Sequence, residues 1–216
     1  MNDSLDEIAK RNCQGILLVV SNPVDILTYT ALKLSGFTEN RVIGSGTVLD
    51  TARLKYELGE HLSVDSRSVH AFIIGEHGDS EIAAFSSANV SGIALSEFCE
   101  LRGHYTHDEN TQKIAETVKN SAYDIIKKKR ATYYGIAMAV KRICEVIIRD
   151  EKSILPVSSM MHGAYAIEDV VLSMPSVVGK HGVETQVPIP LSEEEKEKLL
   201  HSAETLKKII KEVEEK

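Results

Sequence analysis

Residues 16–25 read ILLVVSNPVD, an unbroken aliphatic run followed by a polar turn. The run over residues 16–20 predicts a buried parallel strand, since such strands are covered on both faces. Asn22 and Pro23 then fit the cap and the first position of a helix that continues through Leu34 and stops at Gly36. Polar groups therefore follow the carboxyl end of a strand, where open α/β sheets bind their ligands.

The chain continues with a second βα unit and then changes character. Residues 41–43 predict a short strand, and residues 48–58 predict a helix that ends at Gly59. Before the strand of residues 16–20, a helical face carries Leu5, Ile8 and Ala9. We place a boundary near Leu62, with βαβα units before it and a mixed α+β region after it, so the fold class is α/β.

The region after Leu62 predicts a hairpin, two long helices, an antiparallel sheet and a last helix. Residues 69–74 and 82–85 favour strands joined by a tight turn over residues 75–79. Apolar periodicity predicts helices over residues 108–129 and 133–150. Strands are expected over residues 153–160, 169–174 and 182–189, with Gly163, Pro175, Gly179 and Pro190 between or after them. Ser192 should cap the last helix, with Leu199, Leu206, Ile209 and Val213 facing inward.

Composition excludes several classes of protein. The chain has 216 residues, 25 basic and 32 acidic side chains, and a net charge of -7. This charge provides no positive field for a nucleic-acid backbone. The three widely spaced cysteines predict neither a disulfide framework nor a zinc knuckle, and we expect no metal. The sequence shows no secretory signal and no apolar run long enough to cross a bilayer, so we expect a cytoplasmic protein without a membrane partner.

Two short motifs could take part in catalysis, but their spacing alone does not decide whether they do. His77 lies between glycines in the turn Gly-Glu-His-Gly-Asp, which suits a general acid/base but also fits an ordinary solvated loop histidine. Asp50 and Arg53 lie three residues apart on a helix, so they share a face. They could form a surface ion pair, or Asp50 could orient an imidazole while Arg53 binds a carboxylate.

Three motifs in order resemble the bacterial-type L-lactate dehydrogenases of the lactate/malate dehydrogenase family. They are VSNPVD (residues 20–25), GSGTVLDTAR (residues 44–53) and GEHGDSE (residues 75–81). The similarity continues through ATYYGIA (residues 131–137) and LPVS (residues 155–158). Malate dehydrogenases share much of this layout, but GEHGD and ATYY are more similar to the lactate enzymes.

The resemblance implies a role for each matching residue. It implies that His77 is the catalytic acid/base, Asp50 its partner and Arg53 the ligand of the substrate carboxylate. It places Thr132 in the substrate pocket and Asn22 near both substrate and cofactor, and it assigns Val20, Ser21, Ser45 and Ile136 to the nicotinamide side of NAD. In this reaction, pyruvate and L-lactate are interconverted by hydride transfer as His77 gives or takes a proton.

The resemblance also implies that part of the family pattern is missing. No Gly-x-Gly-x-x-Gly follows a strand, so the pyrophosphate cradle is absent. We expect residues 1–62 to be the end of a Rossmann-type NAD-binding domain with its connecting helix, and residues 63–216 to be the substrate-binding domain. The alternative is a non-catalytic fragment that acts as an assembly or interaction module.

Family resemblance further implies a homo-oligomer, specifically a tetramer, and an allosteric sugar-bisphosphate site between subunits. The corresponding positions here are Lys55 and His70. Lysine lacks the planar fork of arginine, so we expect phosphate binding at Lys55 to be weaker or absent. His70 is equally consistent with an ordinary strand residue.

Overall fold

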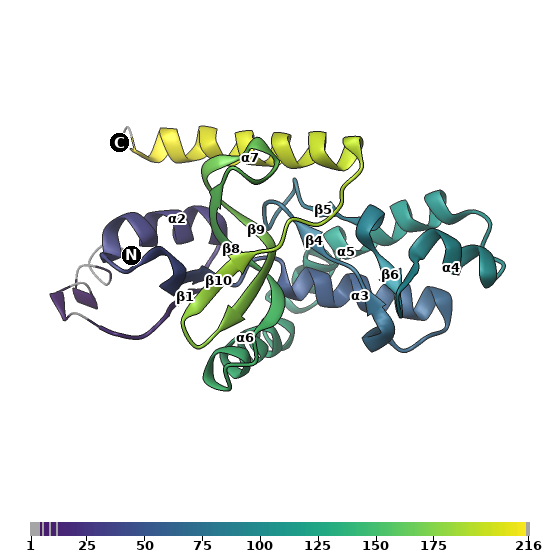
Figure 1. Ribbon diagram of the computed structural model, residues 1–216, viewed down its shortest axis with the longest axis horizontal. Helices are drawn as coiled ribbons and strands as arrows, with labels where there is room; N and C mark the ends of the chain where they lie inside the picture. Colours follow the sequence, from purple (N-terminus) through teal and green to yellow (C-terminus); the bar gives the residue numbers. More distant parts are fainter. Residues whose placement is uncertain (1–4, 6, 9, 12, 215–216) are drawn as a thin grey trace.

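The main sheet combines a parallel pair with an antiparallel meander (Figure 1). The computed structural model describes residues 5, 7–8, 10–11 and 13–214, apart from the side chain of residue 108. Five strands follow the order β1-β2-β8-β9-β10. Strand β1 (Leu17–Val19) is parallel to β2 (Val42–Gly44), and the others are antiparallel: β8 (Ser153–His162), β9 (Glu168–Gly179) and β10 (Gly182–Gln186). The predicted α/β class is confirmed.

Helix α2 (Val24–Ser35) joins the two parallel strands and ends at Gly36, as predicted, where φ is +68°. The predicted cap at Asn22 is wrong. Pro23 is the cap residue, its carbonyl accepts the N–H of Leu27 at 2.9 Å, and no side chain caps this end. A residue before proline is biased toward extended backbone, which moves the start of the helix beyond Asn22.

Ala9, predicted on the preceding helical face, lies outside the described residues, whereas Leu5 packs with Ala31 and Val42.

Helix α3 (Val48–Leu62) runs through Gly59 and is followed by Ser63 in the left-handed region. The predicted end at Gly59 is therefore wrong. A β-carbon at Gly59 would lie 2.9 Å from the carbonyl oxygen of Val64. Glycine is needed there because the returning chain approaches the helix backbone closely, and not because the helix stops.

Residues 69–74 form two short strands in separate sheets, where the sequence predicted one. Strand β3 (Val69–His70) belongs to a sheet with β6 (Asn89–Val90) and β7 (Ile93–Ala94), while β4 (Ile73–Ile74) pairs with β5 (Ile82–Ala83). Thr51 Oγ1 accepts the N–H of Ile73 at 2.8 Å, so a side chain of α3 holds the backbone between the two sheets. The antiparallel β4–β5 hairpin confirms the predicted turn, although a 3₁₀ turn over Phe85–Ser87 shortens the return strand.

The two long helices are confirmed as α5 (His107–Lys129) and α6 (Tyr134–Ile148). The short helix α4 (Leu95–Leu101) was not predicted. Helix α7 (Glu193–Glu214) has the predicted cap, because Ser192 Oγ accepts the N–H of Glu195 at 3.2 Å. Leu199 and Leu206 face inward as predicted, but Ile209 and Val213 are 38% and 51% exposed.

Pro175 lies inside β9, opposite Pro156 of β8, instead of separating strands as predicted. Alternate pairs of an antiparallel ladder exchange no N–H···O bonds, so a proline pair can occupy such a position without losing a donor.

Two apolar layers cover the sheet: α7 lies on one side of β8 and β9, and α6 on the other (Figure 1). Within the described residues, no helix is long and apolar enough to cross a membrane.

Candidate active site

The loop between β4 and β5 carries His77 and is anchored at both of its sides. Gly75 exchanges backbone hydrogen bonds with Ser173 of β9, each at 2.9 Å, and has φ of +87°. The N–H of Glu76 donates to Ser202 Oγ of α7 at 2.9 Å. Any other residue at Gly75 would combine a left-handed backbone with a β-carbon 2.6 Å from Ile82. These contacts fix the position from which the His77 ring projects.

The first two turns of α3 present Asp50 and Arg53 to this loop. Thr47, just before the helix, donates its hydroxyl to the carbonyl of Ile73 at 2.6 Å, so the start of α3 is fixed against β4. Gly46 lets the chain before α3 lie close to β8, because a β-carbon there would lie 2.7 Å from the backbone of Pro156 and Ser158. The glycines at 44 and 46 thus pack against β8, and they do not form a phosphate cradle.

His77, Asp50 and Arg53 form a hydrogen-bonded row. His77 Nδ1 lies 2.7 Å from Asp50 Oδ2, and Arg53 Nη1 donates to Asp50 Oδ1 at 3.1 Å. The Asp50 side chain is only 5% exposed, whereas Arg53 and His77 are 18% and 27% exposed. A buried carboxylate with two partners is not a surface ion pair, so that alternative reading of Asp50 and Arg53 is wrong.

The environment of His77 favours its protonated form. The hydrogen bond to Asp50 raises the pKa of His77 above its usual 6.5, partly opposed by burial, and the charges of Asp25 and Glu81 raise it further. This arrangement leaves Nε2 as the ring atom that can exchange a proton with a substrate, because Nδ1 is engaged by Asp50.

We expect Asp50→Asn to lower the pKa of His77 in this chain, since the replacement removes both the hydrogen-bonding carboxylate and its charge. Because folding raises the pKa of His77, its protonation stabilises the fold below pH 6.5. This stabilisation is lost as the pH rises through the folded-state pKa of His77. NMR titration of the His77 imidazole protons in the unaltered chain and in Asp50→Asn measures the two pKa values. An unchanged His77 titration in Asp50→Asn would contradict the geometry.

Asp25 is a site residue that sequence reasoning did not assign. It is 2% exposed in α2, accepts the backbone N–H of His77 at 2.7 Å, and accepts the hydroxyl of Ser158 at 2.5 Å. Burial raises the pKa of Asp25 to about 6, against the lowering effect of these two hydrogen bonds. An acid in the first turn of a helix is ordinary in a sequence. Its contact with the His77 loop, which lies far along the chain, could be found only in the structure.

Glu81 is the second unassigned acid and lies just before β5. One ligand atom from each of Asp50, His77 and Glu81 lies within 4.8 Å of the others. Burial, followed by the charge of Asp50, raises the pKa of Glu81 to about 8. The site therefore holds one imidazole and three carboxyl groups in a small volume.

The remaining sequence-assigned residues lie around this centre without a described contact to His77. Val20, Ser21 and Asn22 are exposed at the carboxyl end of β1, and buried Ser45 follows β2, where its N–H donates to Val19 at 2.8 Å. Half-buried Thr132 and Ile136 lie at the start of α6. That segment packs on the first turn of α3, since a β-carbon at Gly135 would lie 3.2 Å from Leu49.

Lys55 and His70 are outside the row of hydrogen-bonded groups. Lys55 is half-buried on α3, where burial lowers the pKa of its ammonium group, and His70 is exposed at the end of β3. The anion site implied for Lys55 and His70 stays a prediction.

Two family models match the chain. The lactate/malate dehydrogenase NAD binding domain matches residues 1–44, and the lactate/malate dehydrogenase alpha/beta C-terminal domain matches residues 47–216. L-lactate dehydrogenase of Acetivibrio thermocellus is 55% identical over 207 residues, which are 96% of this chain and 65% of that protein. L-lactate dehydrogenase 1 of Clostridium acetobutylicum is 55% identical over 93% of this chain and 64% of that protein. The chain thus spans about two thirds of the length of these relatives.

Solved structures agree with the sequence matches. The ligand-bound minor L-lactate dehydrogenase from Enterococcus mundtii has a TM-score of 0.92 at 41% identity, covering 98% of this chain and 68% of that one. L-lactate dehydrogenase from Clostridium thermocellum has a TM-score of 0.89 at 43% identity, covering 98% and 70%. With the row His77–Asp50–Arg53 in place and both domain models matched in order, the chain belongs to the lactate/malate dehydrogenase family.

Proposed function

We propose that this chain provides the substrate-binding and proton-transfer half of an NAD-dependent L-lactate dehydrogenase. The observation that carries the proposal is the 2.7 Å contact between His77 Nδ1 and Asp50 Oδ2. It directs Nε2 toward the substrate and favours an imidazolium that can protonate the keto oxygen of pyruvate. In the direction of lactate oxidation, the neutral ring accepts the hydroxyl proton.

Arg53 is the proposed ligand of the substrate carboxylate. Its bond to Asp50 uses Nη1, and a guanidinium carries five N–H donors, so a bidentate carboxylate contact is compatible with that bond. Such a contact would fix the substrate relative to His77 and so reduce the entropic part of the barrier. We propose Thr132 and Asn22 as further substrate contacts, since α6 and β1 border the same region.

The described residues fit one end of NAD. Val20, Ser21, Asn22 and Ser45 lie at the carboxyl ends of the two parallel strands, the edge where such sheets bind nucleotides. We propose that these residues and Ile136 hold the nicotinamide end. When bound, the nicotinamide supplies or accepts the hydride. The two glycines flanking Ser45 pack against β8, so the pyrophosphate has no cradle in the described residues.

The proposal includes a division at Leu62, a homo-oligomer of the tetrameric kind, and a cytoplasmic location. Exposed large apolar side chains support burial against further protein, among them Leu101, Tyr105, Tyr134, Met138 and Ile148. Free cysteines at positions 13, 99 and 144 support a reducing compartment.

A chimera tests the function directly. We would join this chain to the amino-terminal third of the Acetivibrio thermocellus relative and measure NADH consumption with pyruvate and with oxaloacetate. We expect turnover of pyruvate to exceed that of oxaloacetate, and the unextended chain to turn over neither at a comparable rate. Preference for oxaloacetate would identify a malate enzyme, and a folded, inactive chimera would favour a non-catalytic assembly module. Light scattering on the same sample measures the oligomeric mass.

A further inference from the structure

Glu81 lies beside the row of His77, Asp50 and Arg53 but takes no part in its hydrogen bonds. One of its carboxyl oxygens lies within 4.8 Å of a ring nitrogen of His77 and of a carboxyl oxygen of Asp50. Asp50 is engaged twice, by His77 on one oxygen and by Arg53 on the other. Among the described residues, none forms a hydrogen bond with the Glu81 side chain. Glu81 therefore acts on this row through its charge.

The backbone holds Glu81 in this position from both sides. Its N–H donates to the carbonyl of Gly78 at 3.3 Å, within the turn that carries His77. The next residue, Ile82, pairs with Ile74 in the β4–β5 hairpin and is buried in the core. One short, anchored segment thus sets the separation between Glu81 and His77.

Burial and four charged groups set the ionisation of Glu81. Burial has the largest effect, and the charge of Asp50 on α3 acts in the same direction, so the pKa of Glu81 is raised to about 8. The positive charges of His77, of Lys119 on α5 and of Arg53 on α3 oppose this rise. Near neutral pH the Glu81 carboxyl group is therefore protonated, and it ionises as the pH rises past about 8.

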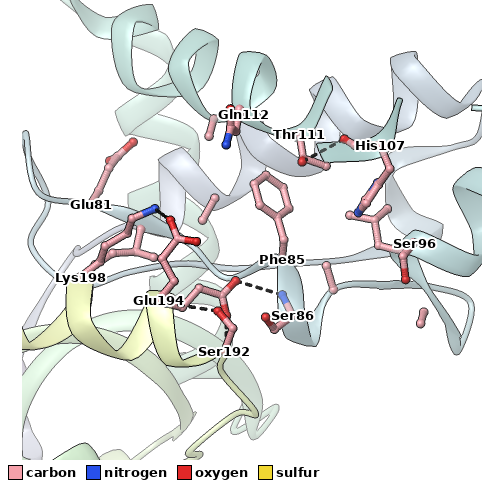
Figure 2. A pocket seen from close by; sticks show the side chains of 17 residues that line it. Glu81, Phe85, Ser86, Ser96, His107, Thr111, Gln112, Ser192, Glu194 and Lys198 are labelled. Carbon is pink, nitrogen blue, oxygen red and sulfur yellow. Dashed lines mark hydrogen bonds and ion pairs between the residues drawn. The ribbon is translucent and has the colours of Figure 1, made fainter. Parts of the chain in front are cut away.

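A cavity of about 600 Å³ between β5, α4, α5 and α7 gives Glu81 access to water (Figure 2). The charged groups of α7 that line it have partners of their own: Lys198 contacts Glu194 at 2.6 Å, and Glu195 accepts two backbone N–H groups. His107 of α5 has its Nδ1 3.2 Å from a thiol sulfur. In Figure 2 no hydrogen bond or ion pair joins Glu81 to the other residues drawn. The cavity is therefore the place where Glu81 exchanges its proton with water.

The other acids near His77 are engaged in hydrogen bonds. Asp25 accepts the backbone N–H of His77 at 2.7 Å, and Glu76 accepts the N–H and the hydroxyl of Ser80. Asp50 contacts His77 Nδ1. These bonds anchor the loop and orient the ring. Glu81 differs from all three acids, because its carboxyl group can change its charge without breaking a bond to another described residue.

A count of charges shows what the release of the Glu81 proton does. With Asp50 ionised, His77 and Arg53 positive and Glu81 protonated, the four side chains carry one net positive charge. Loss of the Glu81 proton removes this net charge and places a negative charge within 4.8 Å of the imidazolium ring. A negative charge at this distance favours the protonated form of the imidazole.

We propose that Glu81 is a positioning residue of the proton-transfer centre: it holds a proton at neutral pH and, by releasing it to the cavity, keeps His77 protonated in alkaline solution. The two groups then titrate as a coupled pair, in which ionisation of one favours the charged form of the other. Glu81 acts on the substrate only through His77. The consequence for turnover rests on the proposed function, whereas the coupling itself does not.

NMR titration of this chain tests the coupling without any turnover. In Glu81→Gln the side chain keeps its shape but cannot become negative, so the His77 imidazole should titrate at least about 0.5 pH unit lower than in the unaltered chain. The reciprocal measurement follows the ¹³C signal of the Glu81 carboxyl group. In His77→Asn that group loses a neighbouring positive charge, so it should titrate at a higher pH.

Two variants control these measurements, and melting curves check that each variant folds. Glu81→Asp keeps a titratable carboxyl group, so His77 should titrate at a higher pH than in Glu81→Gln. Glu194→Gln removes an acid that lines the same cavity but is 74% exposed and paired with Lys198, so the His77 titration should not change. An unchanged His77 titration in Glu81→Gln, or an equal shift in Glu194→Gln, would overturn the proposal. Should Glu81→Gln fail to fold, the Glu81 titration in His77→Asn decides it.

The pH dependence of pyruvate reduction in the chimera tests the consequence for turnover. Reduction requires the imidazolium form, so kcat/KM should fall at a lower alkaline pH in Glu81→Gln than in the unaltered chimera, with Glu81→Asp in between. The same alkaline limit in all three active proteins would contradict the role of Glu81. An inactive unaltered chimera would count against the proposed function instead, and the NMR titrations would still decide the coupling.

Discussion

His77→Asn should lower kcat for pyruvate reduction by about 10²–10⁴-fold in the chimera with the Acetivibrio thermocellus segment, the range that general acid/base groups contribute. Asparagine retains the polar contact to Asp50 but has no group that exchanges a proton near neutral pH. The side chain of His77 is 27% exposed and lies in a loop, so the fold should tolerate the smaller asparagine. Stopped-flow and steady-state NADH absorbance give kcat and KM.

Arg53→Lys provides the contrast for that experiment. Lysine keeps the positive charge but cannot form the planar two-point contact with a carboxylate, so KM for pyruvate should rise and kcat should also fall through poorer positioning. The pattern differs from that of His77→Asn, which should affect kcat far more than KM. Ordinary activity in His77→Asn would show that another group transfers the proton, and the assignment of His77 would be abandoned.

The sequence predicted the pieces of this site because each piece is local. The hairpin turn that carries His77 and the i, i+3 pair of Asp50 and Arg53 depend on turn chemistry and helix periodicity. Whether Asp50 faced water or His77 depended on how α3 docks against β4. That docking rests on Thr47 and Thr51, whose hydroxyls bond the backbone of Ile73. Such side-chain to backbone bonds leave no periodic signal.

Two of the wrong predictions, those at Gly59 and Pro175, have a common origin in close backbone packing. Gly59 was read as a helix end and Pro175 as a strand end, because both residues disfavour regular structure when considered alone. In the fold, Gly59 lets residues 64–66 approach α3, and Pro175 occupies a strand position opposite Pro156. Tertiary contacts reverse the local preference in both cases.

Three titratable groups of the candidate active site share one electrostatic feature. Asp25, Glu81 and His77 all have pKa values above their usual ones, the first two chiefly through burial and His77 chiefly through its bond to Asp50. A raised folded-state pKa means that the folded state binds protons more readily than the unfolded chain. The stabilisation from each group is therefore present at low pH and declines as the pH rises through the folded-state pKa of that group. The region is suited to holding a proton for transfer.

Asp25→Ala should lower the free energy of unfolding by about 1–3 kcal/mol, the cost of leaving buried polar partners unpaired. The partners are the backbone N–H of His77 and the hydroxyl of Ser158. Loss of the first bond also releases the loop that positions the imidazole, and a displacement of about 1 Å there can reduce turnover by about 10²-fold. Urea unfolding of this chain and kinetics of the chimera measure the two effects. Glu204→Ala, an exposed acid on α7, is the control.

Asp25→Asn separates the charge of Asp25 from its shape. The pKa of Asp25 rises from 3.8 to about 6 on folding, so its protonated form stabilises the fold below about pH 4, and that stabilisation disappears as the pH rises to about 6. An asparagine stays neutral throughout this range and should flatten that part of the pH–stability curve. Urea midpoints from pH 4 to pH 7 for both proteins measure the difference in slope. Equal slopes would mean that Asp25 is ionised as easily in the folded chain as in the unfolded one. Its buried contact with the His77 loop would then have to be solvated, which would undo the anchoring role assigned to it here.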